Sequence, residues 1–105
     1  MNEKRALVTG GSGDIGEAIC RALAREGWRV IVHAHAHRER ADAVANEIRN
    51  AHGAAEIATF DLTDAAATGT ALDDLLQAGP VHALIHNAGI HDDAPLAGMT
   101  GEQWR

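Results

Sequence analysis

The chain has 105 residues, a formal net charge of −6 at pH 7 and a single cysteine. This length suits one compact domain, and an apolar content of 46% excludes a disordered composition. The negative charge disfavours nucleic acid and anionic membranes as partners, and no apolar run approaches the length of a membrane span. Cys20 cannot form an internal disulfide and the first residues contain no signal-peptide segment, so we expect a cytoplasmic protein.

The first elements follow from a change of hydrophobic pattern. The apolar run at residues 6–8 predicts a buried strand, and the glycines within residues 9–13 predict a tight turn after it. Residues 14–26 then have helical periodicity, with Gly27 as the expected end of the helix. The apolar face of this helix is expected to consist of Ile15, Ile19, Ala22 and Leu23. A second buried strand is expected at residues 30–32.

Two more helices alternate with two more strands. The second helix is expected to stop at Gly53 and to bury one face, formed by Ala41, Val44, Ala45 and Ile48. A third strand is expected at residues 55–60, and Asp64 is the expected N-cap of a third helix. That helix is expected to turn three leucines inward: Leu72, Leu75 and Leu76. A fourth strand follows at residues 81–86, and a loop at residues 89–99.

The order of elements is β-α-β-α-β-α-β, and Thr100 begins a further helix. Strands alternating with helices predict an α/β fold with a parallel sheet, and right-handed crossovers predict the Rossmann-like half unit with strand order 3-2-1-4. The sequence stops at Arg105, inside the new helix, and leaves the fourth strand as an open edge. We therefore expect residues 1–105 to be the dinucleotide-binding part of a longer protein.

Three glycines with regular spacing lie between the first strand and the first helix. Gly10 allows a tight turn, Gly13 leaves room for a pyrophosphate, and Gly16 lets the helix pack closely. The free N–H groups and the positive dipole end of the helix would then face the phosphates. The alternative is a structural turn that binds no ligand.

These residues, and three segments after them, resemble the short-chain dehydrogenase/reductase family. Residues 9–16 resemble its cofactor loop, residues 60–63 its acidic motif after strand three, residues 86–89 its Asn-Asn-Ala-Gly motif, and residues 99–104 the start of its fifth helix. Within the family, the last segment is most similar to 3-oxoacyl-acyl-carrier-protein reductases. The resemblance implies that the cofactor is bound by Gly10, Ser12, Gly13, Asp14, Ile15, Gly16, Asp61, Leu62, Asn87, Ala88 and Gly89.

Two positions depart from the single-domain branch of that family. The middle glycine is at Gly13, where the branch would place it at the position of Asp14; this spacing resembles the extended branch, which includes nucleotide-sugar epimerases. His86 replaces the first Asn of the Asn-Asn-Ala-Gly motif. A carboxylate at Asp14 suits the helix dipole but would repel a diphosphate, so its side chain is expected to point away from the loop.

The end of the second strand predicts which nicotinamide cofactor is used. NAD-binding enzymes of this fold carry an acid there for the ribose hydroxyls, whereas no acid occurs here before Glu39. This absence favours NADP, with Arg38 and His35 or His37 as the positive charge for its 2′-phosphate. Alternatively, Arg38 simply begins a solvated helix face.

The remaining chemically active side chains give weaker signals. His33, His35 and His37 alternate, so on an extended segment they share one face. Zinc is a possible ligand, but no fourth ligand is evident, and a polar rim around the adenosine end is preferred; no metal is expected. Cys20 is expected to be a small core residue.

The family's catalytic residues are missing from this chain. The resemblance implies a Tyr acid/base, a Lys that lowers its pKa and a Ser that orients the carbonyl. The chain has no tyrosine, its only lysine is Lys4 and its only serine is Ser12. We therefore expect no catalytic residue within it.

We expect the full-length parent to be an oligomeric NADPH-dependent reductase of 3-oxoacyl thioesters on acyl carrier protein, in fatty acid biosynthesis. The alternatives are an extended-branch nucleotide-sugar epimerase or dehydratase, and a dinucleotide-binding module without catalysis.

Overall fold

The computed structural model describes residues 4–11 and 13–86, which form a four-stranded parallel sheet and three helices. The elements are β1 (Arg5–Thr9), α1 (Asp14–Arg25), β2 (Arg29–Ala34), α2 (Arg38–Asn50), β3 (Ala54–Thr59), α3 (Ala65–Gln77) and β4 (Ala83–His86). The expected loop at residues 89–99 and the helix starting at Thr100 lie outside the described residues. No helix in the described ranges is long and apolar enough to cross a membrane.

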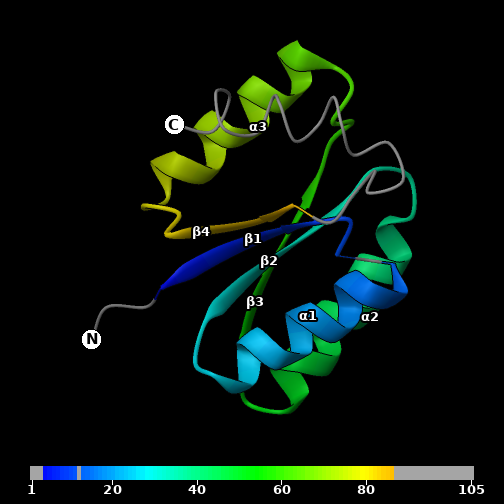
Figure 1. Cartoon of the computed structure of the whole chain (residues 1–105), viewed down its shortest axis with the longest axis vertical. Helices are drawn as coiled ribbons and strands as arrows, with labels where there is room; N and C mark the ends of the chain where they lie inside the picture. Colours follow the sequence, from blue (N-terminus) through cyan, green and yellow to red (C-terminus); the bar gives the residue numbers. More distant parts are fainter. Residues whose placement is uncertain (1–3, 12, 87–105) are drawn as a thin grey trace.

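The sheet has the order β3-β2-β1-β4, as the sequence predicts. Leu7 in β1 lies between Ile31 of β2 and Leu84 of β4, and every strand pair is parallel. Because each crossover is right-handed, the reversal after β3 carries the chain over the opposite face. Accordingly, α1 and α2 lie on one side of the sheet and α3 lies on the other (Figure 1).

The core lies where the two central strands meet α1 and α2. Val8, Val30 and Val32 are inaccessible to solvent because β1 and β2 have neighbours on both edges. The predicted inner face of α2 is confirmed, since all four of its members are buried: Ala41, Val44, Ala45 and Ile48. Cys20 is buried in the same cluster, which confirms its predicted place in the core.

Local chemistry explains how the helices begin and end. The Asp64 carboxylate accepts a hydrogen bond from the Ala67 N–H at 3.0 Å, so the predicted N-cap of α3 is confirmed. Gly27 follows α1 with a φ of +95°, as a helix-ending glycine should. After α2, however, the left-handed residue is His52, with a φ of 71°, and not Gly53. Gly53 is needed for a different reason, because a Cβ there would lie 2.7 Å from Ile48 Cγ2.

Three side chains predicted to face the core are exposed. Ile15 and Leu76 are 65% and 54% exposed, and Ala22 is also exposed. The inner stripe of α1 is centred on Gly16 and Cys20, and Ile15 lies one residue before it, about 100° round the helix. Leu76 is displaced in the same way from Leu75, so the width of the apolar face was overestimated.

A buried arginine joins the opposite ends of the described chain. The Arg5 guanidinium contacts Glu56 of β3 at 3.0 Å and donates to the carbonyls of Leu75 and Gly79 at 2.8 and 2.6 Å. Arg29 also reaches Glu56, at 2.9 Å. Arg5 therefore connects β1, β3 and the C-terminal end of α3.

Candidate functional site

The carboxyl ends of β1 and β4 mark where a ligand would bind. The chain leaves β1 toward β2 on one side, whereas β4 lies on the other side of β1 and follows β3 (Figure 1). The strand order therefore reverses between β1 and β4, and open α/β sheets bind ligands outside the carboxyl ends at such a reversal. Thr9 and His86, paired across these two strands, are the last residues of their strands.

The glycine turn after β1 approaches α1 too closely for any side chain at Gly16. Gly10 has a φ of +67°, and its carbonyl accepts a hydrogen bond from the Gly13 N–H at 3.1 Å. A Cβ at Gly16 would lie 2.7 Å from Gly11 Cα and would also collide with the Gly10 carbonyl. The predicted structural roles of Gly10 and Gly16 are therefore confirmed.

Gly13 is not required by the backbone in the same way. Its φ of −84° and ψ of 171° suit any residue, and a Cβ there would meet only the Gly10 carbonyl oxygen, at 3.5 Å. Gly13 is the N-cap of α1 and provides no side-chain hydrogen bond to the first turn. The N–H groups of this helix end, together with the helix dipole, form a place where an anion can bind.

Sequence reasoning gave no role to Gly11, where the fold leaves little room for a side chain. A Cβ on Gly11 would lie 3.1 Å from each of three atoms: Cys20 Sγ, Val32 Cγ1 and the Val8 carbonyl oxygen. The signal available in the sequence was the pair of adjacent glycines at the end of the strand. Burial raises the pKa of the Cys20 thiol to about 12, so this cysteine is an inert packing residue.

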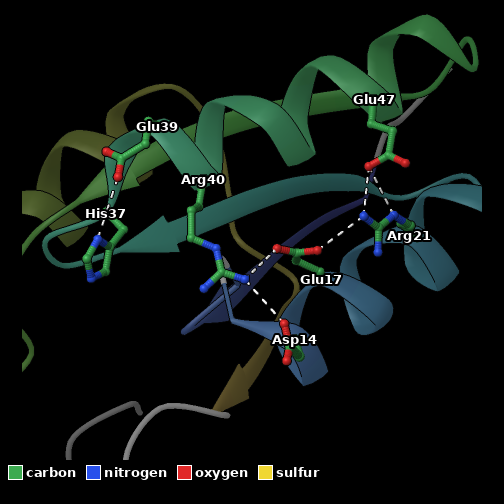
Figure 2. A network of polar contacts seen from close by, with 7 residues as sticks. All are labelled: Asp14, Glu17, Arg21, His37, Glu39, Arg40 and Glu47. Atoms are coloured by element: carbon green, nitrogen blue, oxygen red, sulfur yellow. Dashed lines mark hydrogen bonds and ion pairs between the residues drawn. The ribbon is translucent and has the colours of Figure 1, made fainter.

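Asp14 belongs to a network of charges between α1 and α2 (Figure 2). Its carboxylate is 98% exposed and lies 3.2 Å from the Arg40 guanidinium, which also contacts Glu17 at 3.1 Å. Arg21 joins Glu17 to Glu47 of α2, at 3.2 and 2.7 Å. Arg40 therefore compensates the charge of Asp14 at the helix end where an anion would bind, and the sequence analysis did not identify this partner.

Two predicted site residues after β2, Arg38 and His35, have different charged partners. Arg38 is exposed, and its Nε lies 3.8 Å from Asp42, one turn further along α2. His35 is also exposed, but its Nε2 lies 3.6 Å from Asp61 Oδ2. Hydrogen bonds from the Thr63 hydroxyl and N–H to Asp61, at 2.7 and 2.9 Å, hold the pKa of that carboxyl below its usual value. The structure thus brings His35 and Asp61 together after β2 and β3.

The three alternating histidines do not share one polar face, which corrects the sequence interpretation. His33 is 2% exposed, whereas His37 is exposed and lies 3.6 Å from Glu39. The alternation fails because the extended strand ends at Ala34. Within residues 4–11 and 13–86, no group of three or more His, Cys, Asp or Glu side chains is placed to hold a metal ion.

His86 ends β4 next to the glycine turn. Its Nδ1 lies 3.1 Å from the Thr9 hydroxyl, while its Nε2 is buried and has no hydrogen-bond partner within the described part of the chain. Predicted site residues Ser12, Asn87, Ala88 and Gly89 lie outside the described residues. Leu62 follows Asp61 and is half-buried.

A parallel sheet with this order, and a glycine turn at its point of reversal, defines a Rossmann-like half unit. The model of the family described as short chain dehydrogenase matches residues 4–105. The chain therefore belongs to the short-chain dehydrogenase/reductase family.

Relatives and solved structures agree with this family. The 3-oxoacyl-[acyl-carrier-protein] reductase of Staphylococcus epidermidis is 35% identical, over 96% of this chain and 42% of the relative. The acetoacetyl-CoA reductase of Cupriavidus necator is 37% identical, over 99% of this chain and 43% of the relative. A metagenomic short-chain oxidoreductase solved in complex with NADP superimposes with a TM-score of 0.78 at 38% identity, over 82% of this chain and 39% of that one. The chain thus spans about two fifths of the length of these proteins.

Proposed function

We propose that this chain binds NADP(H) and forms the cofactor-binding part of an oxidoreductase that reduces a carbonyl group. The observation that carries the proposal is the glycine turn, where backbone contact at Gly16 brings the N-terminus of α1 against the carboxyl end of β1. The pyrophosphate would lie against that helix end, beside Gly13. Asp61 and Leu62 would contact the adenine, as the family resemblance implies.

The preference for NADP over NAD rests on the end of β2. No carboxylate comes from the last residues of β2, where a ribose-binding acid would repel a 2′-phosphate. His35 and Arg38 are both exposed there and can approach a phosphate. The NADP complex of the metagenomic relative supports the same cofactor.

The proposed substrates are 3-oxoacyl thioesters. Both named relatives are reductases of such compounds by name, one of an acyl-carrier-protein thioester and one of acetoacetyl-CoA. The Gly10, Gly13 and Gly16 spacing favours a second candidate, a nucleotide-sugar epimerase or dehydratase of the extended branch. Those enzymes use NAD(P) without net consumption, so oxidation of NADPH in proportion to substrate by the full-length parent would distinguish the reductase.

Calorimetric titration of the chain with NADPH and NADH tests the cofactor assignment. We expect tighter binding of NADPH, and a smaller difference in Arg38→Ala, because a cation beside the 2′-phosphate is lost. Arg25→Ala is the matched control, since it removes the same charge from the exposed far end of α1. Equal or tighter binding of NADH by the unsubstituted chain would refute the assignment.

A further inference from the structure

His33 is a buried titratable side chain to which the proposed function gives no role. It lies at the carboxyl end of β2 with 2% of its surface exposed, and its ring packs against Phe60 with centroids 4.4 Å apart. Its Nδ1 is 2.9 Å from the Gly10 backbone nitrogen, and its Nε2 is 2.8 Å from the Phe60 carbonyl oxygen. One imidazole therefore connects the segment after β1 with the segment after β3.

The two backbone partners determine the protonation state of the ring. The Gly10 N–H can only donate, so Nδ1 must present its lone pair. The Phe60 carbonyl can only accept, so Nε2 must carry the hydrogen. The ring is therefore the neutral Nε2–H tautomer. A proton added to Nδ1 would point at the Gly10 N–H, so this hydrogen bond would be lost.

We propose that neutral His33 is a positioning residue for the dinucleotide and that its protonation weakens binding. The two segments it connects are the glycine turn, which would hold the pyrophosphate, and residues 60–62, which would hold the adenine. These contacts bind opposite parts of one ligand, so a fixed separation between them lowers the cost of ordering the site on binding. The inference rests on the proposed function, because it assigns a ligand to both segments.

The surroundings keep this histidine neutral near pH 7. Burial lowers the pKa of His33 from its ordinary value of 6.5, while the hydrogen bond to the Phe60 carbonyl acts in the opposite direction. The titratable groups around it are His35 just after β2, His86 on β4 and Asp61, which follows Phe60 and pairs with His35. The two histidines lower the pKa further when they are charged. The connection is therefore complete at neutral pH and is lost on acidification.

Two substitutions test the two hydrogen bonds of His33 one at a time, because each places a polar atom near only one of the ring nitrogens. His33→Asn places an amide oxygen where Nδ1 lies and keeps an acceptor for the Gly10 N–H. His33→Gln places an amide nitrogen near Nε2, keeping the donor to Phe60 but leaving Gly10 without that acceptor. Each variant keeps one bond and loses the other, so we expect both to bind NADPH about tenfold or more weakly than the unsubstituted chain, which corresponds to about 1.4 kcal/mol.

Hydrogen exchange of the Gly10 amide, followed by NMR, measures the connection without any cofactor. We expect protection in the unsubstituted chain and in His33→Asn, and faster exchange in His33→Gln. NADPH affinity of the unsubstituted chain is expected to fall as the pH drops through the lowered pKa of His33, whereas in His33→Asn this titration should be absent. If His33→Gln does not fold, the pH series and the Asn variant decide the matter.

Failure of the two proposals can be told apart. If the unsubstituted chain binds neither NADPH nor NADH, the proposed function fails, and the role of His33 in dinucleotide binding fails with it. If NADPH binds but both variants keep the affinity of the unsubstituted chain, the function stands and the positioning role is wrong. Acid weakening of binding that persists unchanged in His33→Asn would likewise overturn the role of the proton.

Discussion

Gly13 and Gly16 differ in what a methyl group would meet at each position. At Gly16 it would collide with backbone atoms of Gly10 and Gly11, which cannot move without disturbing the end of β1. We expect Gly16→Ala to lower the free energy of unfolding by about 1–3 kcal/mol, the usual cost of overpacking. At Gly13 the methyl group would make only an ordinary contact with the Gly10 carbonyl oxygen. Gly13→Ala should therefore change the free energy of unfolding by less than about 1 kcal/mol.

The Gly13→Ala variant also distinguishes an effect on stability from an effect on cofactor binding. If the pyrophosphate lies beside Gly13, Gly13→Ala should weaken NADPH binding although the chain remains as stable as before. Urea unfolding, followed by tryptophan fluorescence, and NADPH titration measure the two effects separately. Unchanged affinity in a well-folded Gly13→Ala variant would place the pyrophosphate elsewhere.

Asp14 and Arg40 form an exposed ion pair, and we expect NADPH affinity to depend on the net charge of this pair. Asp14→Asn should change NADPH affinity by less than about tenfold, because Arg40 already lies against the carboxylate. Arg40→Gln should weaken binding by up to about fivefold, since exposed pairs contribute about 1 kcal/mol or less. The double variant should recover most of that loss. Titration at two salt concentrations checks the cause, because a loss that does not shrink with salt is not electrostatic.

The structural roles of Gly10 and Gly16 could be predicted from the sequence, whereas the place of His33 could not. Glycine spacing at a strand–helix junction allows few geometries, so local pattern suffices. His33 is stabilised by Gly10 and Phe60, which are 23 and 27 residues away and reach it only through the sheet order. Alternating histidines resemble a polar rim, and nothing local indicates that backbone groups will satisfy one of them in the core.

At the scale of elements, Arg5 determines how α3 is attached to the sheet. Its guanidinium is 7% exposed and hydrogen-bonds Glu56 as well as two carbonyls at the end of α3. Arg5→Met should lower the free energy of unfolding by about 1–3 kcal/mol, because two carbonyls at the end of α3 lose their donor and the half-buried Glu56 carboxylate keeps only Arg29. Arg29→Met is the control: Arg29 contacts the same carboxylate but is 37% exposed, and should cost less than about 1 kcal/mol. Equal losses in urea unfolding would show that the connection to α3 contributes nothing.

The ionised Glu56 carboxylate should make the stability of the fold depend on pH. Burial raises its pKa, but the hydrogen bonds from Arg5 and Arg29 outweigh burial and hold the pKa below 4.5. The ionised form therefore stabilises the fold at pH values above 4.5, and this contribution is lost as the pH falls through the lowered value. In Arg5→Met the pKa of Glu56 should move back toward 4.5, so the loss of stability on acidification should become smaller, as unfolding measured across an acid series would show.

Helix ends and faces show where element-level prediction works. Asp64 was recognisable as a cap because its carboxylate bonds an N–H only three residues away. Gly53 was expected to stop the second helix, yet the left-handed residue of the turn is His52, and Gly53 leaves room for Ile48. Periodicity gave the direction of each apolar face but not its width, which depends on the element that covers it.

For the molecule as a whole, the strand order was predictable because alternating elements and right-handed crossovers leave few topologies. Which residues of separate strands meet at the carboxyl edge was harder to foresee. The pairing of His35 with Asp61 depends on where β2 and β3 end, to within a residue. The sequence therefore locates the site, while its detailed contacts require the structure.

The whole chain also makes a prediction about activity. In the resemblance to its family, proton transfer belongs to a Tyr assisted by a Lys, but this chain contains no tyrosine, and its only lysine, Lys4, precedes β1 at the other end of the strand from the glycine turn. We expect the chain to bind NADPH without oxidising it in the presence of acetoacetyl-CoA. The absorbance of the reduced nicotinamide measures turnover, with the Cupriavidus necator acetoacetyl-CoA reductase as positive control. Binding with no turnover would separate cofactor recognition from catalysis. Substrate-dependent oxidation above the protein-free rate, in material free of host reductases, would mean that another side chain of this chain supplies the proton.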